Sequence, residues 1–153
     1  MSNTKLLNDC LRGDRRAQRV FYETFAPQMF PVCLRYCRSR EEAEEVLQEG
    51  FLLVFRNLRQ YRGDGALEGW IRKIMVNASL QKIRSRPGLT PLLNSANEHP
   101  EIAEEAMALD RIGTKELIGL IQELPPMYRA VFNLYVFEGM KHREIAEMLN
   151  ISE

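Results

Sequence analysis

Apolar residues recur at intervals of three and four along nearly the whole chain, which is the spacing of an amphipathic α-helix. No stretch has the strict alternation of a β-strand, and no internal repeat is present. The clearest helix is expected over residues 39–58, where Ser39 and Glu42 have the capping-box spacing. Its apolar stripe consists of Ala43, Val46, Leu47, Phe51, Val54, Phe55 and Leu58. The pattern predicts an all-α protein.

Two further helices are expected before this one. A short helix over residues 4–11 ends at a Gly-Asp break, and Asp14 can act as the N-cap of the next helix. Pro27 and Pro31 fall within the pattern of that second helix, and proline lacks the N–H that a helix interior requires. We therefore expect the second helix to bend or break there and then resume. Its buried side begins with Ala17, Phe21 and Phe25.

A helix over residues 67–86 has apolar residues on two sides, which indicates that it is covered twice. The main stripe consists of Leu67, Ile71, Ile74, Met75 and Ala78. The second apolar face consists of Val76, Leu80 and Ile83. A polar and aromatic flank separates the two faces and consists of Trp70, Lys73, Asn77 and Arg84.

Prolines, glycine and polar residues gather over residues 87–100 and predict a linker. The economical organisation is two small helical domains, over residues 1–86 and 101–153. The second begins with a helical stretch that is broken or weakened at Gly113.

The last thirty residues have the order of a helix-turn-helix. Two prolines follow Leu124 and start an apolar helix, which Gly139 is expected to close. A short helix is expected over residues 141–149, followed by a tight turn and an N-cap at residues 150–152. The second helix of such a motif enters the major groove of DNA. It would begin at Glu153, where the sequence ends, so we expect a truncated motif with impaired groove reading.

The net charge of zero conceals two charged segments. Residues 41–49 contain five glutamates and no basic residue, whereas residues 56–86 contain eight basic and two acidic residues. The first segment suits a basic protein partner and the second suits a phosphate backbone. Each could equally be a solvated helix face. Leu52 lies within the acidic face, which favours a docking surface over a purely solubilising one.

Composition argues against several classes of protein. The sequence contains no apolar run long enough to span a membrane and no secretory signal. Three cysteines without such a signal indicate free thiols in the cytoplasm. Cys33 and Cys37 could share a ligand face, but zinc needs four placed ligands, and buried structural thiols fit better. Enzyme motifs are absent as well, so we expect no metal, no cofactor and no catalysis.

The basic segment interleaves cations with aromatic and amide side chains, as nucleic-acid surfaces do. Cations neutralise phosphates, Asn can bond a base edge, and aromatic rings can stack on unpaired bases. Core packing is the competing explanation for Trp70, and a solubilising face is the competing explanation for Lys73 and Arg84.

Four short motifs resemble bacterial sigma factors of the small extracytoplasmic-function (ECF) class. Residues 44–51 with 55–58 resemble the polymerase-binding segment of that family, and residues 69–77 resemble the segment that melts and reads the −10 promoter element. Residues 11–14 with residues 21–22 are similar to the family's opening. Residues 124–131, with Gly139 and residues 144–146, are similar to the start of its −35-reading domain. The motifs occur in family order over nearly the whole chain. Gly50 departs from helical propensity because it lies in the middle of a helix.

The resemblance implies partners and site residues. Core RNA polymerase, through the coiled coil of its largest-subunit clamp, would bind the acidic helix at Glu44, Glu45, Gln48, Glu49 and Leu52. Promoter DNA would bind the basic helix and its preceding loop, where a flipped base would be held. The implied DNA-binding residues are Arg62, Asp64, Trp70, Arg72, Lys73, Asn77, Arg84 and Arg86. An anti-sigma protein is the expected regulator.

Two other functions compete with a sigma factor. One is a helix-turn-helix regulator that binds DNA and never contacts polymerase, and the acidic face with Leu52 argues against it. The other is a helical interaction module that binds no nucleic acid.

Overall fold

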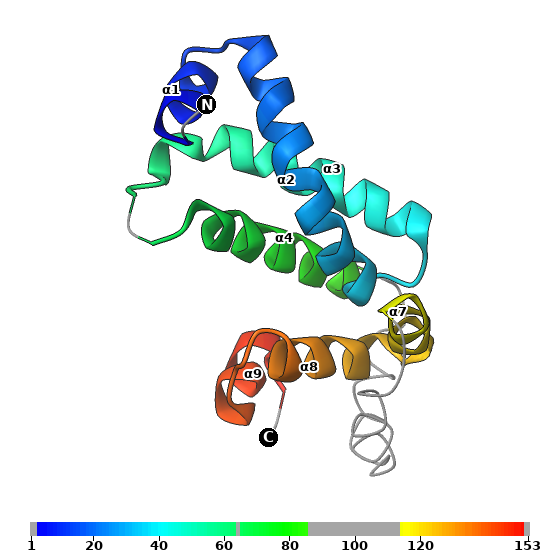
Figure 1. Ribbon diagram of the computed structural model, residues 1–153. Helices are drawn as coiled ribbons and strands as arrows, with labels where there is room; N and C mark the ends of the chain where they lie inside the picture. Colours follow the sequence, from blue (N-terminus) through cyan, green and yellow to red (C-terminus); the bar gives the residue numbers. More distant parts are fainter. Residues whose placement is uncertain (1–2, 64, 86–113, 152–153) are drawn as a thin grey trace.

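The computed structural model describes residues 3–63, 65–85 and 114–151, and all the regular elements within these ranges are helices. The elements of the first part are α1 (Asn3–Leu11), α2 (Arg15–Tyr36), α3 (Arg40–Arg56), the 3-10 turn η1 (Leu58–Gln60) and α4 (Leu67–Arg84). The elements of the second part are α7 (Thr114–Glu123), α8 (Pro126–Val136) and α9 (His142–Leu149). Helices α2, α3 and α4 pack together; α7 and α8 contact α2, and α8 also contacts α4 (Figure 1). The all-α prediction is confirmed.

Two predicted caps begin the main helices. The Asp14 carboxylate accepts hydrogen bonds from the backbone N–H groups of Arg16 and Ala17, at 2.9 and 3.3 Å. The Ser39 hydroxyl accepts one from the Glu42 N–H at 3.2 Å. Each cap satisfies donors that a helix start leaves without an intrahelical partner.

Helix α2 runs without interruption through Pro27 and Pro31, so the predicted break does not occur. Proline removes one backbone hydrogen bond but leaves the helical φ accessible. The residues around the two prolines, Phe25, Met29 and Cys33, are almost fully buried. Their packing compensates for the missing hydrogen bonds and keeps one helix of twenty-two residues.

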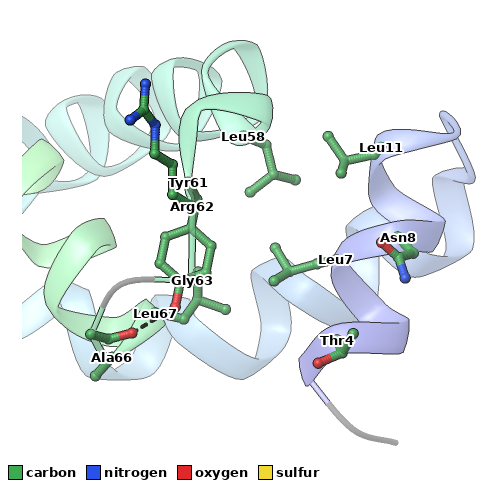
Figure 2. A pocket seen from close by; sticks show the side chains of 11 residues that line it. Thr4, Leu7, Asn8, Leu11, Leu58, Tyr61, Arg62, Gly63, Ala66 and Leu67 are labelled. Carbon is green, nitrogen blue, oxygen red and sulfur yellow. Dashed lines mark hydrogen bonds between the residues drawn. The ribbon is translucent and has the colours of Figure 1, made fainter.

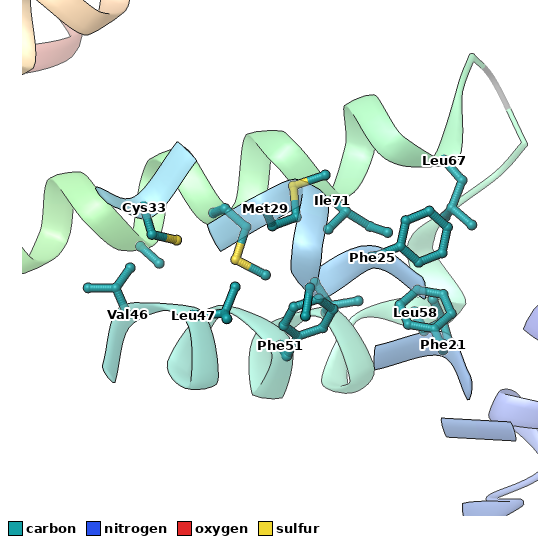
Figure 3. Packing of buried hydrophobic residues seen from close by; sticks show 14 of the residues in the cluster. Phe21, Phe25, Met29, Cys33, Val46, Leu47, Phe51, Leu58, Leu67 and Ile71 are labelled. Carbon is teal, nitrogen blue, oxygen red and sulfur yellow. The ribbon is translucent and has the colours of Figure 1, made fainter. Parts of the chain in front are cut away.

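The first core lies between α2, α3 and α4 (Figure 3), and Leu6 and Cys10 of α1 belong to it as well. Phe21 packs against the rings of Phe25, Phe51 and Phe55, with centroids 4.8 to 6.5 Å apart. Ile71 and Met75 bring the main stripe of α4 into this core, both fully buried. The helix stripes predicted from the sequence therefore form one apolar centre.

Gly50 allows α3 to approach α4 closely. A β-carbon at this position would lie 2.3 Å from Sδ of Met75. The glycine that disagreed with helix propensity is thus explained by packing, because only a residue without a side chain leaves room for Met75.

A second core joins the two parts of the chain. It contains Val32 and Tyr36 of α2, the second apolar face of α4 (Val76, Leu80 and Ile83), and residues Met127, Ala130, Leu134, Ile145 and Leu149 of α8 and α9. The prediction that α4 is covered on two sides is confirmed, and the second cover is the α8–α9 pair. The predicted linker, residues 87–100, lies outside the described residues, so the domain boundaries stay a prediction.

None of the helices in the described ranges is both long and apolar enough to cross a membrane.

Candidate functional site

The acidic side of α3 faces away from both cores. Glu44, Glu45, Gln48 and Glu49 are exposed, and Leu52 is the most exposed large apolar residue in the described chain, at 64%. Glu42, by contrast, is buried and pairs with Arg38 at 3.0 Å. The five residues predicted from the sequence therefore share one open surface, which we call the α3 face (Glu44, Glu45, Gln48, Glu49 and Leu52).

One ion pair connects the α3 face to α4. The Lys82 ammonium donates a hydrogen bond to the Glu45 carboxylate at 3.1 Å, and this bond raises the pKa of Lys82. A second pair, Arg40 with Glu44 at 3.4 Å, stays within α3. Both pairs are solvent-exposed, and such pairs contribute little to stability. Their carboxylates remain accessible to a basic partner.

The polar flank of α4 is only partly as predicted. Lys73, Asn77 and Arg84 are exposed. Trp70 is half-buried: it packs on the edge of the first core and on the Tyr61 ring, with centroids 5.6 Å apart. The sequence left two interpretations of Trp70 open, core packing and a surface for an unpaired base. The indole is compatible with both, because part of its surface packs on the core and part remains accessible to solvent. We call Trp70, Lys73 and Asn77 the α4 flank.

Arg72 does not lie on the α4 flank. It follows Trp70 by two residues, about 200° around the helix axis. Its guanidinium makes a two-pronged ion pair with Glu138, with Nε–Oε1 at 2.8 Å and Nη2–Oε2 at 2.5 Å. This pairing raises the pKa of Arg72. Arg84 is also engaged, because it donates a hydrogen bond to the backbone carbonyl of Met148 in α9.

The loop before α4 borders a cavity of about 520 Å³ that faces α1. Figure 2 shows Arg62 and Gly63 on one side and Thr4, Leu7, Asn8 and Leu11 on the other. The loop turns at Gly63 and Gly65, whose positive φ angles of 79° and 88° suit glycine. The Tyr61 hydroxyl donates to the Gly65 carbonyl at 2.7 Å and closes the turn. Arg62 is exposed, while Asp64 and Arg86 lie outside the described residues.

Cys33 and Cys37 are buried, as predicted, and Cys10 is buried as well. Burial raises the pKa of the Cys33 thiol to about 12 and that of Cys10 to about 11. Within the described ranges, no three His, Cys, Asp or Glu side chains are placed to hold one metal ion.

The predicted helix-turn-helix pattern is present as far as the described residues reach. Pro126 begins α8, Gly139 turns the chain with φ of 66°, and α9 follows. The Glu144 carboxylate accepts a hydrogen bond from the Lys141 backbone N–H at 3.0 Å and caps α9. Asn150 ends α9 in the left-handed conformation, with φ of 58°, as the predicted tight turn requires. Residues 152–153 lie outside the described ranges.

Three residues were not among the sequence predictions: Gln122, Arg129 and Asn133. Each donates a hydrogen bond to a backbone carbonyl at the end of α2, namely those of Leu34, Tyr36 and Arg35, at 3.0, 2.9 and 2.8 Å. Arg129 is 3% exposed and Asn133 is fully buried. The sequence contains a signal for two of the three, because Arg129 and Asn133 lie four residues apart and interrupt the apolar side of α8.

Two family models match the chain: "Sigma-70 region 2" covers residues 21–87 and "Sigma-70, region 4" covers residues 114–153. The chain belongs to the sigma-70 family. It is 28% identical over 156 residues to the RNA polymerase sigma-H factor of Pseudomonas aeruginosa, covering 95% of this chain and 81% of the relative. It is 26% identical over 152 residues to the ECF RNA polymerase sigma factor SigM of Mycobacterium tuberculosis, covering 99% and 76%. With the ECF factor SigW of Bacillus subtilis the identity is 24%, covering 96% and 84%.

The sigma-70 assignment confirms the predicted family, its ECF class and a role in transcription initiation. Its relatives are initiation factors and not enzymes. The α3 face and the α4 flank both lie within the region-2 match. The roles of their individual residues are therefore a matter for a proposal.

Proposed function

We propose that this sigma factor binds core RNA polymerase through the α3 face and opened promoter DNA through the α4 flank. The observation that carries the proposal is the placement of both surfaces on one bundle. Helices α3 and α4 pack directly against each other through Gly50 and Met75. A polymerase bound to α3 would therefore hold α4 in a fixed position relative to the DNA.

The α3 face has the chemistry of a protein-docking surface. A central exposed Leu52 surrounded by acidic side chains offers apolar contact together with a charge that selects a basic partner. The expected partner is the coiled coil of the polymerase largest-subunit clamp.

The α4 flank has the chemistry of a surface for unpaired bases. Lys73 supplies a cation for phosphate, Asn77 can bond a base edge, and Trp70 supplies an aromatic surface. The cavity beside Arg62 falls in the size range of small-molecule sites, about 300–1,000 Å³, and would receive a flipped base. Because base flipping costs a few kcal/mol of stacking, contacts in the cavity must offset that cost.

Further parts of the proposal rest on the family alone. The protein would act in the cytoplasm, an anti-sigma protein would regulate it, and α7 to α9 would form the −35-reading part.

Binding to polymerase is tested by retention of the chain on immobilised core enzyme. Leu52→Asp should abolish retention, because it places a charge at the centre of the docking surface. Leu120→Asp is the matched control: Leu120 is also exposed, at 42%, but lies on α7. Equal retention of the parent and Leu52→Asp would contradict the docking surface. Loss of retention in the Leu120→Asp control would show that the assay responds to a new charge at any exposed leucine, and not to the α3 face in particular.

DNA binding is tested by fluorescence anisotropy with a bubble-containing fragment and core polymerase at several salt concentrations. Lys73→Ala should weaken binding and reduce the log–log salt slope by about one, since one phosphate contact is lost. Lys115→Ala is the control, because Lys115 is exposed on α7, and it should leave the salt slope unchanged. If Lys73→Ala and Lys115→Ala give the same slope, α4 is not the DNA surface.

A further inference from the structure

A cation from α4 lies beside the α3 face. The Lys82 ammonium donates a hydrogen bond to the Glu45 carboxylate at 3.1 Å. Glu49, about one turn further along α3, also attracts this ammonium. The Lys82 side chain is 30% exposed and the Glu45 side chain is 62% exposed. The lysine stem is therefore held against the protein, whereas the carboxylate that it binds stays open to solvent.

The proposed DNA contacts do not explain Lys82. It follows Lys73 by nine residues, which is about 180° around the helix axis. Helices α3 and α4 lie side by side (Figure 1), and Lys82 reaches across from α4 to α3. Its ammonium is thus placed among the carboxylates of the α3 face, on the opposite side of α4 from the Lys73 side chain.

The position of Lys82 compensates for repulsion within the α3 face. Glu45 and Glu49 are four residues apart, and like charges at this spacing destabilise a helix. A cation beside both carboxylates offsets that repulsion. Because an exposed ion pair contributes little free energy, a cation from a binding partner can replace Lys82 at small cost.

We propose that Lys82 competes with polymerase for Glu45: in the free protein its ammonium occupies the position that a cation of the clamp takes when the α3 face docks. This inference rests on the proposed polymerase-binding role of the α3 face. Docking then exchanges one ion pair for another, so Lys82 lowers the affinity for core enzyme. Lys82 also determines specificity, because a partner must supply a cation that binds Glu45 better than Lys82 does.

Lys82→Met is the primary test, because methionine keeps an unbranched side chain and removes the charge. Lys82→Arg keeps a cation at the same position and should restore the affinity of the parent. Lys115→Met is the matched control, since it makes the same replacement, with the same change of net charge, at an exposed position on α7.

The measurement is the dissociation constant of the fluorescently labelled full chain with core polymerase, without DNA, at several salt concentrations. Lys82→Met should bind about threefold more tightly than Lys115→Met, which is the size expected when one exposed ion pair no longer has to be broken. Its affinity should also fall more steeply with salt, because Glu45 then meets the partner with its full charge.

A double-mutant cycle with Glu45→Gln separates the ion pair from general effects of charge. Glu45→Gln alone should weaken binding to core polymerase. In that background the carboxylate that Lys82 occupies is gone. Lys82→Met should then strengthen binding no more than Lys115→Met does.

The outcomes separate this inference from the proposed function. If Lys82→Met binds core polymerase no better than Lys115→Met while Leu52→Asp abolishes binding, competition is wrong and the docking surface stands. Weaker binding of Lys82→Met would show that Lys82 holds Glu45 in place for polymerase, which also overturns competition. Equal strengthening by Lys82→Met with and without Glu45 would reveal a long-range effect of charge, and competition is again wrong. If Leu52→Asp and Glu45→Gln both bind as the parent does, both proposals fail.

Discussion

Replacing Gly50 with alanine tests the close contact that joins the two candidate surfaces. A β-carbon at this position would lie 2.3 Å from Sδ and 2.9 Å from Cε of Met75. Met75 is fully buried, so its thioether cannot swing into solvent and must displace other core atoms. Overpacking of this kind costs about 1–3 kcal/mol.

The same substitution also has a favourable part. Alanine is better than glycine in a helix interior by about 0.5–1 kcal/mol. Because the steric term is the larger, we expect Gly50→Ala to lower the free energy of unfolding by about 1 kcal/mol. Gly119 provides the matched control, since a β-carbon there meets no atom within 4 Å. Gly119→Ala should raise stability by about 0.5–1 kcal/mol.

Urea unfolding followed by far-ultraviolet circular dichroism measures both effects, and thermal melting provides a second reading. For a chain of this size, 1 kcal/mol corresponds to about 2–4 °C in Tm. In a Met75→Ala background the clashing atoms are gone, so Gly50→Ala should become stabilising there. If Gly50→Ala stabilised the parent as much as Gly119→Ala does, the close approach of α3 and α4 would be refuted.

Three further predictions concern stability. Asp14→Ala removes the cap of α2 and should cost about 1 kcal/mol in urea unfolding; an unchanged midpoint would mean that the cap contributes nothing. Arg129→Met leaves the carbonyls of Tyr36 and Leu124 without this donor and should lower the free energy of unfolding by about 1–3 kcal/mol. An unchanged free energy of unfolding would mean that the Arg129 hydrogen bonds between α8 and the end of α2 contribute nothing. Burial raises the pKa of Cys33 from 9.0 to about 12, so the folded state binds more protons above pH 9.0. The contribution of this thiol to stability is therefore complete below pH 9.0 and is lost as the pH rises toward 12. Cys33→Ala should show a shallower fall in unfolding free energy over that range than the parent, and identical slopes would argue against the shift.

Local signals in the sequence predicted the first part of the fold well. Asp14 and Ser39 cap their helices because capping depends on residues two or three positions away. The two apolar sides of α4 also followed from periodicity alone, although periodicity could not say what covers the second side. The continuous α2 was missed because its prolines are tolerated through tertiary packing.

Local sequence patterns likewise predict some residues of the candidate site and miss others. Leu52 could be placed on an open face by counting along one helix. Arg72 was assigned to DNA from a motif, whereas its helical position already separates it from Trp70 by about 200°. Its partner Glu138 lies 66 residues away in sequence, and the donors that cap α2 lie 88 to 98 residues from their acceptors. A local pattern can mark such a donor as unusual, as it does for Arg129 and Asn133, but its partner follows only from the packing of whole helices.

The most direct test of the account is photo-crosslinking in the complex with core polymerase and bubble-containing DNA. A photoreactive amino acid replaces Asn77 on the α4 flank, and the same group replaces Lys115 on α7 as the control. The account predicts that position 77 crosslinks to a single strand of the bubble only when polymerase is present and only when Leu52 is intact. Crosslinking from position 115 alone, or from position 77 to duplex DNA outside the bubble, would contradict it.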